Sequence, residues 1–418
     1  MRSTGTVHII GAGLSGLSAA VHLAEAGRRV VVYESAGHAG GRCRSFYDEH
    51  LDRSIDNGNH LILSGNRSAE RYLRITGGTD GFFAPDFAEY PFVDLESGER
   101  WTVRPDRGAI PWSLLFRRNR IPGSRIIDYL RGVRLSRASH NATIRDCLGD
   151  SGILYDRFWE PLAVSVLNTP ADEASAALLW PVIRETFGRG EAACRPLIAH
   201  KGLSDALVDP ALSYIESHGG DIKLNERITD LQADRSVVRA ISTQSGEIAV
   251  DTDDAIVIAV PAPAARGLVP DLAVPNAFEP IVNAHFLLPE PSESIQFLGL
   301  VGGICHWLFV RGDVASVTVS AARDLAALPA DKIADHMWPE VLAALGLGDV
   351  ARGRYRIIKE KRATFSQTPE QMERRSGPRT EYENVLIAGD WTDTGLPATI
   401  EGSIRSGETV AATIKESA

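Results

Sequence analysis

The chain has 418 residues, of which 44% are hydrophobic and 23% are charged, and its formal net charge at pH 7 is -10. These proportions exclude a disordered protein, and the length predicts two domains rather than one. The acidic balance disfavours nucleic acid as a partner. The four cysteines have no metal-ligand spacing, so we expect free thiols in a reducing compartment and no bound metal.

Neither a secretory signal nor a membrane span is expected. An apolar, β-rich run begins at residue 6, which leaves no room for a signal core before it. The longest apolar stretch, 297–310, contains three glycines and a histidine and is shorter than the about 18 residues of a spanning helix. We therefore expect a cytoplasmic protein that is soluble or lies on the inner face of the cytoplasmic membrane.

Residues 6–34 have the layout of a dinucleotide-binding βαβ unit. A strand is predicted at 6–10, and it ends at the sequence Gly-Ala-Gly-Leu-Ser-Gly. Apolar residues at helical spacing follow as far as residue 24, and a second apolar run, 30–33, ends at Glu34. Strand, glycine turn, helix, strand and acid in this order predict a site for an adenine dinucleotide.

The glycine turn explains how phosphates are bound. Gly11 permits the tight turn, Gly13 permits close approach of a pyrophosphate, and Gly16 permits close packing of the helix. Unpaired N–H groups at the start of the helix, beginning with Leu14 and Ser15, attract the phosphates.

An acid follows the second strand. The Glu34 carboxylate, followed by Ser35, suits ribose hydroxyls and repels a 2′-phosphate, which disfavours NADP.

Two polar loops follow this unit. The first contains Gly41 and Arg42 and suits a loop that folds back onto the phosphates, where Arg42 neutralises their charge. The second is the turn Asn57-Gly58-Asn59-His60, which leads into an apolar run.

The glycine motif, Glu34 and the sequence Gly-Gly-Arg-x-x-Ser at 40–45 together resemble the FAD-binding amine oxidase and phytoene desaturase superfamily. A predicted strand ending at Gly389-Asp390, followed by a helix from near Pro397, is similar to the second half of its signature. The resemblance implies FAD as the cofactor, with the start of this helix at the flavin, where it would stabilise negative charge on the reduced ring. The cofactor-binding residues it implies are Gly11, Gly13, Leu14, Ser15, Gly16, Glu34, Ser35, Gly41, Arg42, Asn57, Gly58, Asn59, His60, Ile228, Gly389, Asp390, Ala398, Thr399 and Ile400.

The fold class that the resemblance implies is α/β, of the amine oxidase and phytoene desaturase type. A discontinuous, Rossmann-like FAD-binding domain is expected from 1–70, 195–265 and 355–418. An α+β substrate domain is expected from 71–194 and 266–354. Within the FAD-binding domain, we expect a hairpin at 237–250 and, after it, a buried strand at 254–261.

One segment of the expected substrate domain is strongly basic. Residues 104–137 contain nine arginines and two aspartates, interleaved with large apolar residues. This pattern suits peripheral association with an anionic membrane surface. The alternative is a pair of helices with apolar core faces and solvated arginines.

Four further segments resemble the family of hydroxysqualene dehydroxylases, the squalene-associated FAD enzymes of bacterial hopanoid synthesis. They are 56–60, 158–170, 360–365 and 389–402. Amine oxidases carry an aromatic residue of their amine cage where this chain has Thr399, and the apolar residues around it suit a hydrocarbon better than an ammonium group. The resemblance implies an isoprenoid lipid substrate and conversion of hydroxysqualene to squalene by hydride from N5 of reduced flavin. No second Gly-x-Gly-x-x-Gly motif is present, so the sequence indicates no NAD(P)H-binding domain, and the external electron donor stays unidentified.

The residue that assists loss of the hydroxyl is open between three candidates, His60, Glu360 and Lys361. His285 lies roughly where amine oxidases carry a lysine beside the flavin, and is a departure from their pattern. Phe158, Trp159, Trp180 and Phe187 are candidates for the wall of an apolar tunnel.

Three other functions stay open. They are a carotenoid-type desaturase or isomerase whose flavin accepts hydride, a flavin amine oxidase, and a non-catalytic lipid carrier that contains FAD.

Overall fold

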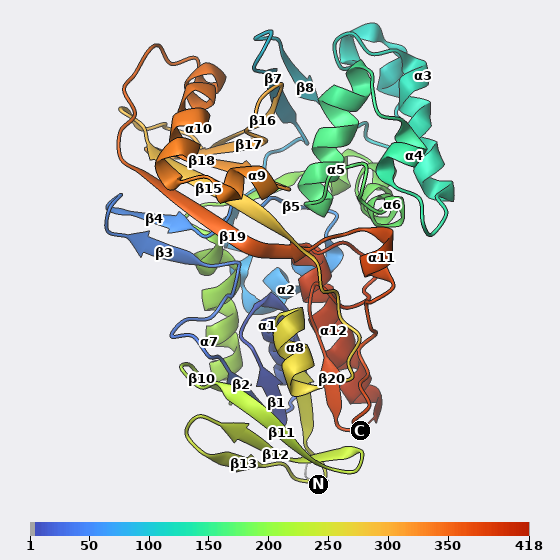
Figure 1. Ribbon diagram of the computed structural model, residues 1–418, viewed down its shortest axis with the longest axis vertical. Helices are drawn as coiled ribbons and strands as arrows, with labels where there is room; N and C mark the ends of the chain where they lie inside the picture. The colour runs from blue at the N-terminus through green and yellow to red at the C-terminus, as the bar shows by residue number, and fades with distance from the viewer. Residues whose placement is uncertain (1–4, 418) are drawn as a thin grey trace.

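The structure is a computed structural model that describes residues 5–417. Residues 1–4 and 418, which the expected FAD-binding domain includes, lie outside the described residues. Figure 1 shows two lobes, one above the other, and the first and last of the described residues lie in the lower lobe. None of the helices within 5–417 is long and apolar enough to cross a membrane.

A five-stranded parallel sheet forms the centre of the lower lobe. Its order is β10 (Asp221–Lys223), β2 (Val30–Tyr33), β1 (Val7–Ile10), β14 (Ala255–Ile258) and β20 (Val385–Ile387). Both β1 and β2 are buried throughout, as expected for parallel strands covered on both faces. All five strands come from the three segments expected to form the FAD-binding domain.

Helices and a small sheet cover the two faces of this sheet. One face packs against α1 (Leu14–Glu25), α2 (Arg67–Thr76), α7 (Asp209–Ser217) and α12 (Ile400–Ser417). The other face packs against α8 (Ala262–Leu268) and an antiparallel sheet of β11 (Ile228–Asp234), β12 (Val237–Thr243) and β13 (Glu247–Ala249). The last two strands form the expected hairpin.

The contact between α1 and α12 joins the two ends of the chain. Ser18 Oγ donates a hydrogen bond of 2.8 Å to the carbonyl of Ile404. A Cβ on Gly407 would lie 2.3 Å from the carbonyl oxygen of Ser15, so the helices approach closely only because residue 407 has no side chain.

A seven-stranded sheet organises the upper lobe. Its order is β19 (Tyr355–Phe365), β15 (Phe278–Leu287), β18 (Val314–Val319), β17 (Trp307–Arg311), β16 (Gln296–Val301), β7 (Tyr90–Asp94) and β8 (Arg100–Val103). Helices α9 (Arg323–Ala327) and α10 (Ala330–Leu345) pack on one of its faces.

The strand β19 departs from the expected domain boundary. It lies within 355–418, the segment expected in the FAD-binding domain, yet it pairs with β15 along its whole length, from Phe365 opposite Phe278 to Tyr355 opposite Phe286. Residues 355–365 therefore belong to the seven-stranded sheet. A strand pattern shows that a segment is extended but not which sheet it joins, because that depends on a partner distant in sequence.

A group of short helices forms the rest of the upper lobe. They are α3 (Ile126–Tyr129), α4 (Ile144–Leu148), α5 (Glu160–Leu167) and α6 (Ala176–Glu185), which share one core with several helical turns. The turns that reach this core are η4 (Leu130–Arg137), η5 (Tyr155–Trp159) and η6 (Phe187–Arg189). The turns η2 (Trp112–Leu115), η3 (Arg117–Asn119) and η7 (Glu191–Ala193) contribute no hydrophobic residue to it. The segment 104–137 is thus a chain of short turns and does not form a pair of long helices.

The remaining elements of the described residues are short. They are β3 (Ser45–Asp48) with β4 (Arg53–Asp56), the sheet of β5 (Ile62–Leu63), β9 (Pro196–Ala199) and β6 (Phe82–Phe83), α11 (Pro369–Met372), and the turns η1 (Gly78–Gly81) and η8 (Ser204–Val208).

Candidate active site

One cavity of about 1350 Å³ is lined by residues of both lobes. It begins at the carboxyl ends of β1 and β2 and continues past β19 and β15 to aromatic residues of the upper lobe. Sites for a single drug-sized ligand usually have volumes of about 300–1000 Å³. The cavity therefore has room for a large cofactor together with part of a second molecule.

The cavity brings together nearly all of the expected cofactor-binding residues. Its walls include Gly11, Gly13, Leu14, Ser15, Glu34, Ser35, Gly41, Arg42, Asn57, Gly58, Asn59, His60, Ile228, Gly389, Asp390, Ala398, Thr399 and Ile400. Gly16 lies behind the turn, where a Cβ would be 2.0 Å from the carbonyl oxygen of Gly11. It therefore serves close packing of α1 and not direct contact with a ligand.

The turn between β1 and α1 has the shape and donors that a pyrophosphate requires. Gly11 has a φ of +106°, and a Cβ there would lie 2.5 Å from the carbonyl oxygen of Ala259. A Cβ on Gly13 would meet no atom within 4 Å, so this side of the turn is open to the cavity. The first turn of α1 has no acidic residue, which leaves its N–H groups and positive dipole end available to an anion.

Glu34 is held rigidly at the end of β2. Its carboxylate accepts hydrogen bonds of 2.9 Å from the N–H groups of Ala12 and Ala36. The carboxylate thus lies against the glycine turn, where ribose hydroxyls of a bound dinucleotide would meet it. The open glycine turn, the free N–H groups at the start of α1 and the fixed Glu34 carboxylate together fit an adenine dinucleotide.

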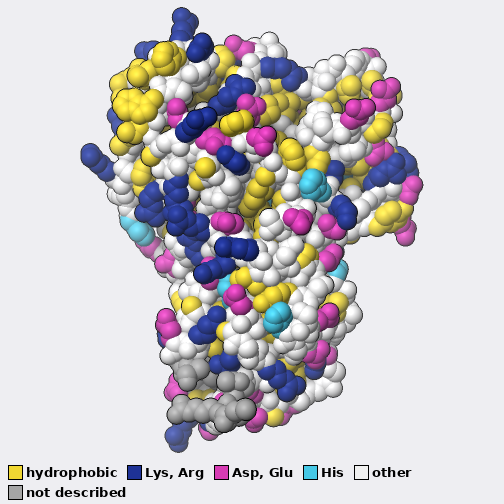
Figure 2. All heavy atoms as spheres, turned by 180° about the vertical axis from the view of Figure 1, so that it is seen from behind, with side chains coloured by type: hydrophobic (Ala, Val, Ile, Leu, Met, Phe, Trp, Pro, Cys, Tyr) yellow, Lys and Arg dark blue, Asp and Glu magenta, His cyan; other side chains and the backbone are white. Residues whose placement is uncertain are grey.

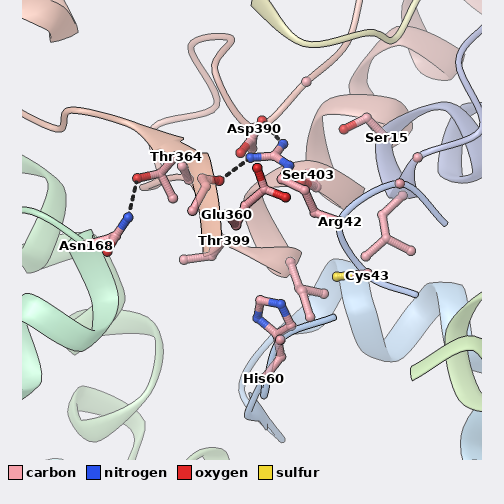
Figure 3. A pocket seen from close by; sticks show the side chains of 18 of the residues that line it. Ser15, Arg42, Cys43, His60, Asn168, Glu360, Thr364, Asp390, Thr399 and Ser403 are labelled. Atoms are coloured by element: carbon pink, nitrogen blue, oxygen red, sulfur yellow. Dashed lines mark hydrogen bonds and ion pairs between the residues drawn. The ribbon is translucent and has the colours of Figure 1, made fainter. Parts of the chain in front are cut away.

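Arg42 joins the beginning of the chain to its end. Its guanidinium forms an ion pair of 2.8 Å with Asp390 and donates a hydrogen bond to the carbonyl of Ala363 in β19 (Figure 3). The Asp390 carboxylate raises the pKa of Arg42. The sequence predicted that Arg42 contacts the phosphates. In the structure, its side chain is directed to Asp390 and Ala363 instead.

A buried arginine holds the loop that follows Asp390. Arg375 donates to the carbonyl groups of Asp390, Trp391 and Thr392, and its guanidinium lies 5.2 Å from the ring centre of Phe365. Burial lowers the pKa of Arg375 to about 10, so it still carries its charge at neutral pH. The sequence analysis missed this residue, because nothing in the local pattern distinguishes it from the neighbouring arginine.

The helix α12 begins three residues later than expected. It starts at Ile400, and the Thr399 hydroxyl accepts a hydrogen bond of 3.1 Å from the N–H of Gly402. Thr399 is therefore the N-cap, and Pro397 precedes the helix. The expectation of a start near Pro397 is wrong because the capping threonine, and not the proline, sets the first turn.

A polar network links the turn 57–60 to the seven-stranded sheet. Thr318 Oγ1 donates to Asn283 Oδ1 at 2.7 Å and accepts from Asn59 Nδ2 at 3.1 Å. Asn283 Nδ2 in turn donates to the carbonyl of Asn57 at 3.2 Å. Asn283 and Thr318 line the cavity but were missed in the sequence, because they lie in predominantly apolar strands with no motif around them.

The three candidates for the acid lie in different surroundings. His60 lines the cavity, and no residue within 5–417 forms a hydrogen bond or ion pair with its side chain. Burial lowers the pKa of His60 to about 4, so its imidazole is neutral at pH 7. Glu360 also lines the cavity, and Figure 3 shows its carboxylate beside Arg42.

Lys361 and His285 do not reach the cavity. Lys361 follows Glu360 in β19 and is exposed outside the cavity wall, in keeping with the alternation of side chains along a strand. His285 is buried, and its Nδ1 lies 2.7 Å from Ser316 Oγ.

The far end of the cavity is apolar. It is lined by Tyr90, Phe92, Val103, Phe158, Leu162, Val166, Val182, Phe187, Trp307 and Phe309. Two of the four expected tunnel residues, Phe158 and Phe187, lie there edge to face, with ring centres 6.1 Å apart. Trp159 and Trp180 pack in the helical core instead and do not line the cavity.

The sequence matches a family profile over almost its whole length. The family described as flavin containing amine oxidoreductase matches residues 14–415. Hydroxysqualene dehydroxylase of Sinorhizobium fredii is 42% identical over 406 residues, and the same-named protein of Zymomonas mobilis is 40% identical over 404 residues. Each alignment covers 97% of this chain and 97% of the relative. A 15-cis-phytoene desaturase of an Oncidium hybrid cultivar is more distant, at 22% identity over 98% of this chain and 77% of the relative.

Solved structures share the fold. Putrescine oxidase bound to putrescine has a TM-score of 0.71 at 15% identity, and cyclohexylamine oxidase from Brevibacterium oxydans has 0.70 at 14%. Both comparisons cover 99% of each chain. They confirm the expected fold class, and the family match confirms a flavin as the cofactor. The chain belongs to the flavin-containing amine oxidoreductases and, within them, to the family of hydroxysqualene dehydroxylases, so that it is an FAD-dependent oxidoreductase.

Proposed function

We propose that the chain converts hydroxysqualene to squalene by replacing the allylic hydroxyl group with hydrogen. The carbon–oxygen bond breaks, a proton and the hydroxyl leave as water, and a hydride reaches the allylic carbon. The names of the relatives at 40–42% identity support this reaction. The observation that carries it is one continuous cavity, which joins a dinucleotide cradle to an apolar end lined by aromatic residues.

The residues that would hold FAD form the polar end of the cavity. The turn at Gly11 and Gly13 would bind the pyrophosphate, Glu34 the ribose, and the loop after Asp390 the part nearer the flavin. When bound in its reduced form, FAD supplies the hydride.

The chain itself contributes an apolar pocket and polar groups at the edge of that pocket. Apolar walls around Phe158, Leu162 and Phe187 bury a hydrocarbon chain and exclude water that would otherwise capture an allylic cation. A neutral His60 has an N–H group free to donate to the departing hydroxyl, and Glu360 is the second group able to hold the proton.

The same geometry argues against oxidation of an amine. Thr399, which replaces the aromatic residue of the amine cage, has its hydroxyl committed to capping α12. Neither it nor the neighbouring Ala398 and Ile400 offers a ring face to an ammonium group.

A single-turnover experiment tests the proposal. Protein reduced chemically under anaerobic conditions is mixed with hydroxysqualene, and flavin absorbance and lipid mass are followed together. Reoxidation of the flavin in step with one equivalent of squalene is the expected result. Reduction of oxidised protein by an isoprenoid, with a new double bond in the product, would instead show a desaturase. Lipid binding with no redox change would show a carrier.

We also propose that the chain works in the cytoplasm, peripherally on the inner face of the cytoplasmic membrane, and receives electrons from a separate donor. The cysteines Cys43, Cys147, Cys194 and Cys305 are free and buried, which suits a reducing compartment. A C30 hydrocarbon is itself poorly soluble in water, so an enzyme that acts on it benefits from contact with a bilayer.

A further inference from the structure

An unusual concentration of exposed apolar side chains lies between residues 110 and 133. Of the fifteen large hydrophobic side chains that are exposed among the described residues, eight belong to this stretch, and they are 40–63% exposed. They are Ile110, Trp112, Leu115, Phe116, Ile126, Ile127, Leu130 and Val133. Seen from behind, hydrophobic side chains gather at one upper corner of the molecule, where Figure 1 places α3, with arginine or lysine side chains above them (Figure 2). Apolar patches of this kind mark interaction surfaces.

Most arginines of the same segment have no partner. Within residues 5–417, none forms a hydrogen bond or ion pair with the guanidinium groups of Arg107, Arg117, Arg118, Arg131, Arg134 and Arg137. The two acids of the segment are used internally: Asp106 accepts from the N–H and hydroxyl of Ser113, and Asp128 accepts from the N–H of Arg125. The unpaired positive charge is therefore directed outward.

Charge decides which partner this surface suits. A second copy of the chain would bring nine arginines and two acids against the same set, which opposes a symmetric dimer through this surface. A bilayer with anionic phospholipids offers the opposite charge at its surface and an apolar layer beneath it. Long arginine side chains reach the phosphates while their apolar neighbours lie deeper.

The segment also lies against the walls of the apolar end of the cavity. The indole of Trp159 packs on Gly132, where a Cβ would lie 2.6 Å from its ring, and the adjacent Phe158 lines the cavity. The carbonyl of Asp106 accepts a hydrogen bond of 2.7 Å from the N–H of Glu191, shortly after the cavity residue Phe187. Both contacts fix the segment beside the site that a lipid must reach.

We propose that residues 104–137 form a docking lobe that inserts its apolar side chains into an anionic bilayer, and that the isoprenoid passes from the bilayer into the apolar end of the cavity beside this lobe. The arginines contact the lipid phosphates, and the aromatic side chains of Trp112 and Phe116 lie below them. The second half of this statement rests on the proposed function, because it takes an isoprenoid as the substrate.

Binding of the FAD-loaded full chain to vesicles tests the docking of the lobe on an anionic bilayer, without reference to activity. Binding is measured to vesicles of phosphatidylcholine alone and to vesicles that also contain phosphatidylglycerol. We expect binding only with the anionic lipid, and weaker binding as salt is raised. Lipids with brominated acyl chains should quench tryptophan fluorescence, and a Trp112→Phe variant should lose most of that quenching.

Two pairs of matched variants locate the surface. Trp112→Ser with Phe116→Ser should weaken vesicle binding at least tenfold, whereas Phe83→Ser with Phe87→Ser, which changes two exposed aromatic residues elsewhere, should not. Arg117→Glu with Arg118→Glu should also weaken it at least tenfold, against no more than twofold for Arg239→Glu with Arg266→Glu. Equal effects of lobe and control variants on vesicle binding would overturn the proposal. It would also be overturned if the unchanged protein were a dimer and the Trp112→Ser, Phe116→Ser variant were a monomer, because the surface would then bind a second copy of the chain.

Turnover assays test the passage of the isoprenoid from the bilayer into the cavity separately from the proposed function. The lobe variants should lose activity on hydroxysqualene held in vesicles and keep it on hydroxysqualene dispersed in detergent. If the unchanged protein fails in both assays yet binds vesicles, the substrate assignment is wrong and docking stands. If the lobe variants retain full activity on vesicles, the lipid does not pass beside the lobe.

Discussion

Arg42 and Asp390 are separated by 348 positions in the sequence and form an ion pair of 2.8 Å at the wall of the cavity. The first belongs to the loop that follows β2, and the second lies in the loop that follows β20. The pair therefore ties the two parts of the cofactor site together, with β19 as a third partner through the carbonyl of Ala363.

Breaking this pair should weaken retention of FAD. Arg42→Ala removes the link between both loops, and a charged hydrogen bond of this type contributes about 1.5–3 kcal/mol, so we expect release of flavin at least tenfold greater than in the unchanged protein. Arg53→Ala removes a surface pair with Asp313 and is the control. Flavin fluorescence after gel filtration measures the loss; equal retention in both variants would show that the pair does not hold the site together.

The buried Arg375 should be more sensitive to a conservative change than an ordinary arginine. Its planar donors reach three carbonyl groups of the loop after β20, which a lysine cannot reach together. Arg375→Lys should lower stability by about 1–3 kcal/mol, since buried acceptors lose their donors, and should loosen flavin binding.

The neighbouring residue provides the comparison for that experiment. Within residues 5–417, the side chain of Arg374 pairs only with Glu370 on the surface, so Arg374→Lys should change stability by less than about 0.5 kcal/mol. Urea unfolding with and without added FAD measures both variants. Indistinguishable midpoints would contradict a clamping role for Arg375.

His60 should act as a neutral donor over the physiological range. Because burial lowers the pKa of His60 to about 4, its charge does not change between pH 5 and 8. We expect the single-turnover rate to be flat over that range and to fall roughly 100-fold in His60→Ala, with partial recovery in His60→Gln, which keeps an N–H donor. A rate that declines above pH 6.5 would indicate an imidazolium acid, and His50→Ala, at an exposed position, serves as the control.

Buried histidines should make the fold sensitive to mild acid. Burial lowers the pKa of His285 from 6.5 to about 4. The unfolded chain therefore binds a proton as pH falls below 6.5 while the folded chain does not, and stability decreases between pH 6.5 and 4 by about 3 kcal/mol for this fully buried residue.

Substitution isolates that contribution. His285→Leu should reduce the loss of unfolding free energy between pH 7 and 4.5, whatever its effect on stability at pH 7. The exposed His140 should show no such effect when changed to leucine. An unchanged pH slope in His285→Leu, measured by urea unfolding, would exclude His285 as a source of the acid sensitivity. His306, whose pKa burial also lowers to about 4, should retain its own share.

Local patterns predicted much of the cofactor end of the molecule. The β1–α1–β2 unit follows from apolar runs of the right period on either side of a glycine turn, and the hairpin of β12 and β13 follows in the same way. The strand before Gly389 was equally clear. In each case the information lies within a few neighbouring residues, which is where intrinsic preference and periodicity act.

The contacts of side chains across the cavity could not be predicted in this way. Whether Glu360 or Lys361 faces the cavity depends on how β19 pairs with β15, and that pairing contains an irregularity between Glu279 and Ile281. Asn283 and Thr318 meet the turn at Asn59 only because separate strands place them there. Such contacts depend on tertiary structure and leave no local pattern.

The sheet that holds the cofactor takes its fifth strand from residues 385–387, and α12 packs on α1 only after that. During synthesis, β1 and its glycine turn therefore leave the ribosome long before the strand and helix that complete their surroundings. Until the last turns of the chain emerge, Arg42 has no Asp390 and α1 has an uncovered apolar face. We therefore expect FAD to be bound only after these last elements have been synthesised, and we expect the uncovered face of α1 to be prone to aggregation until then.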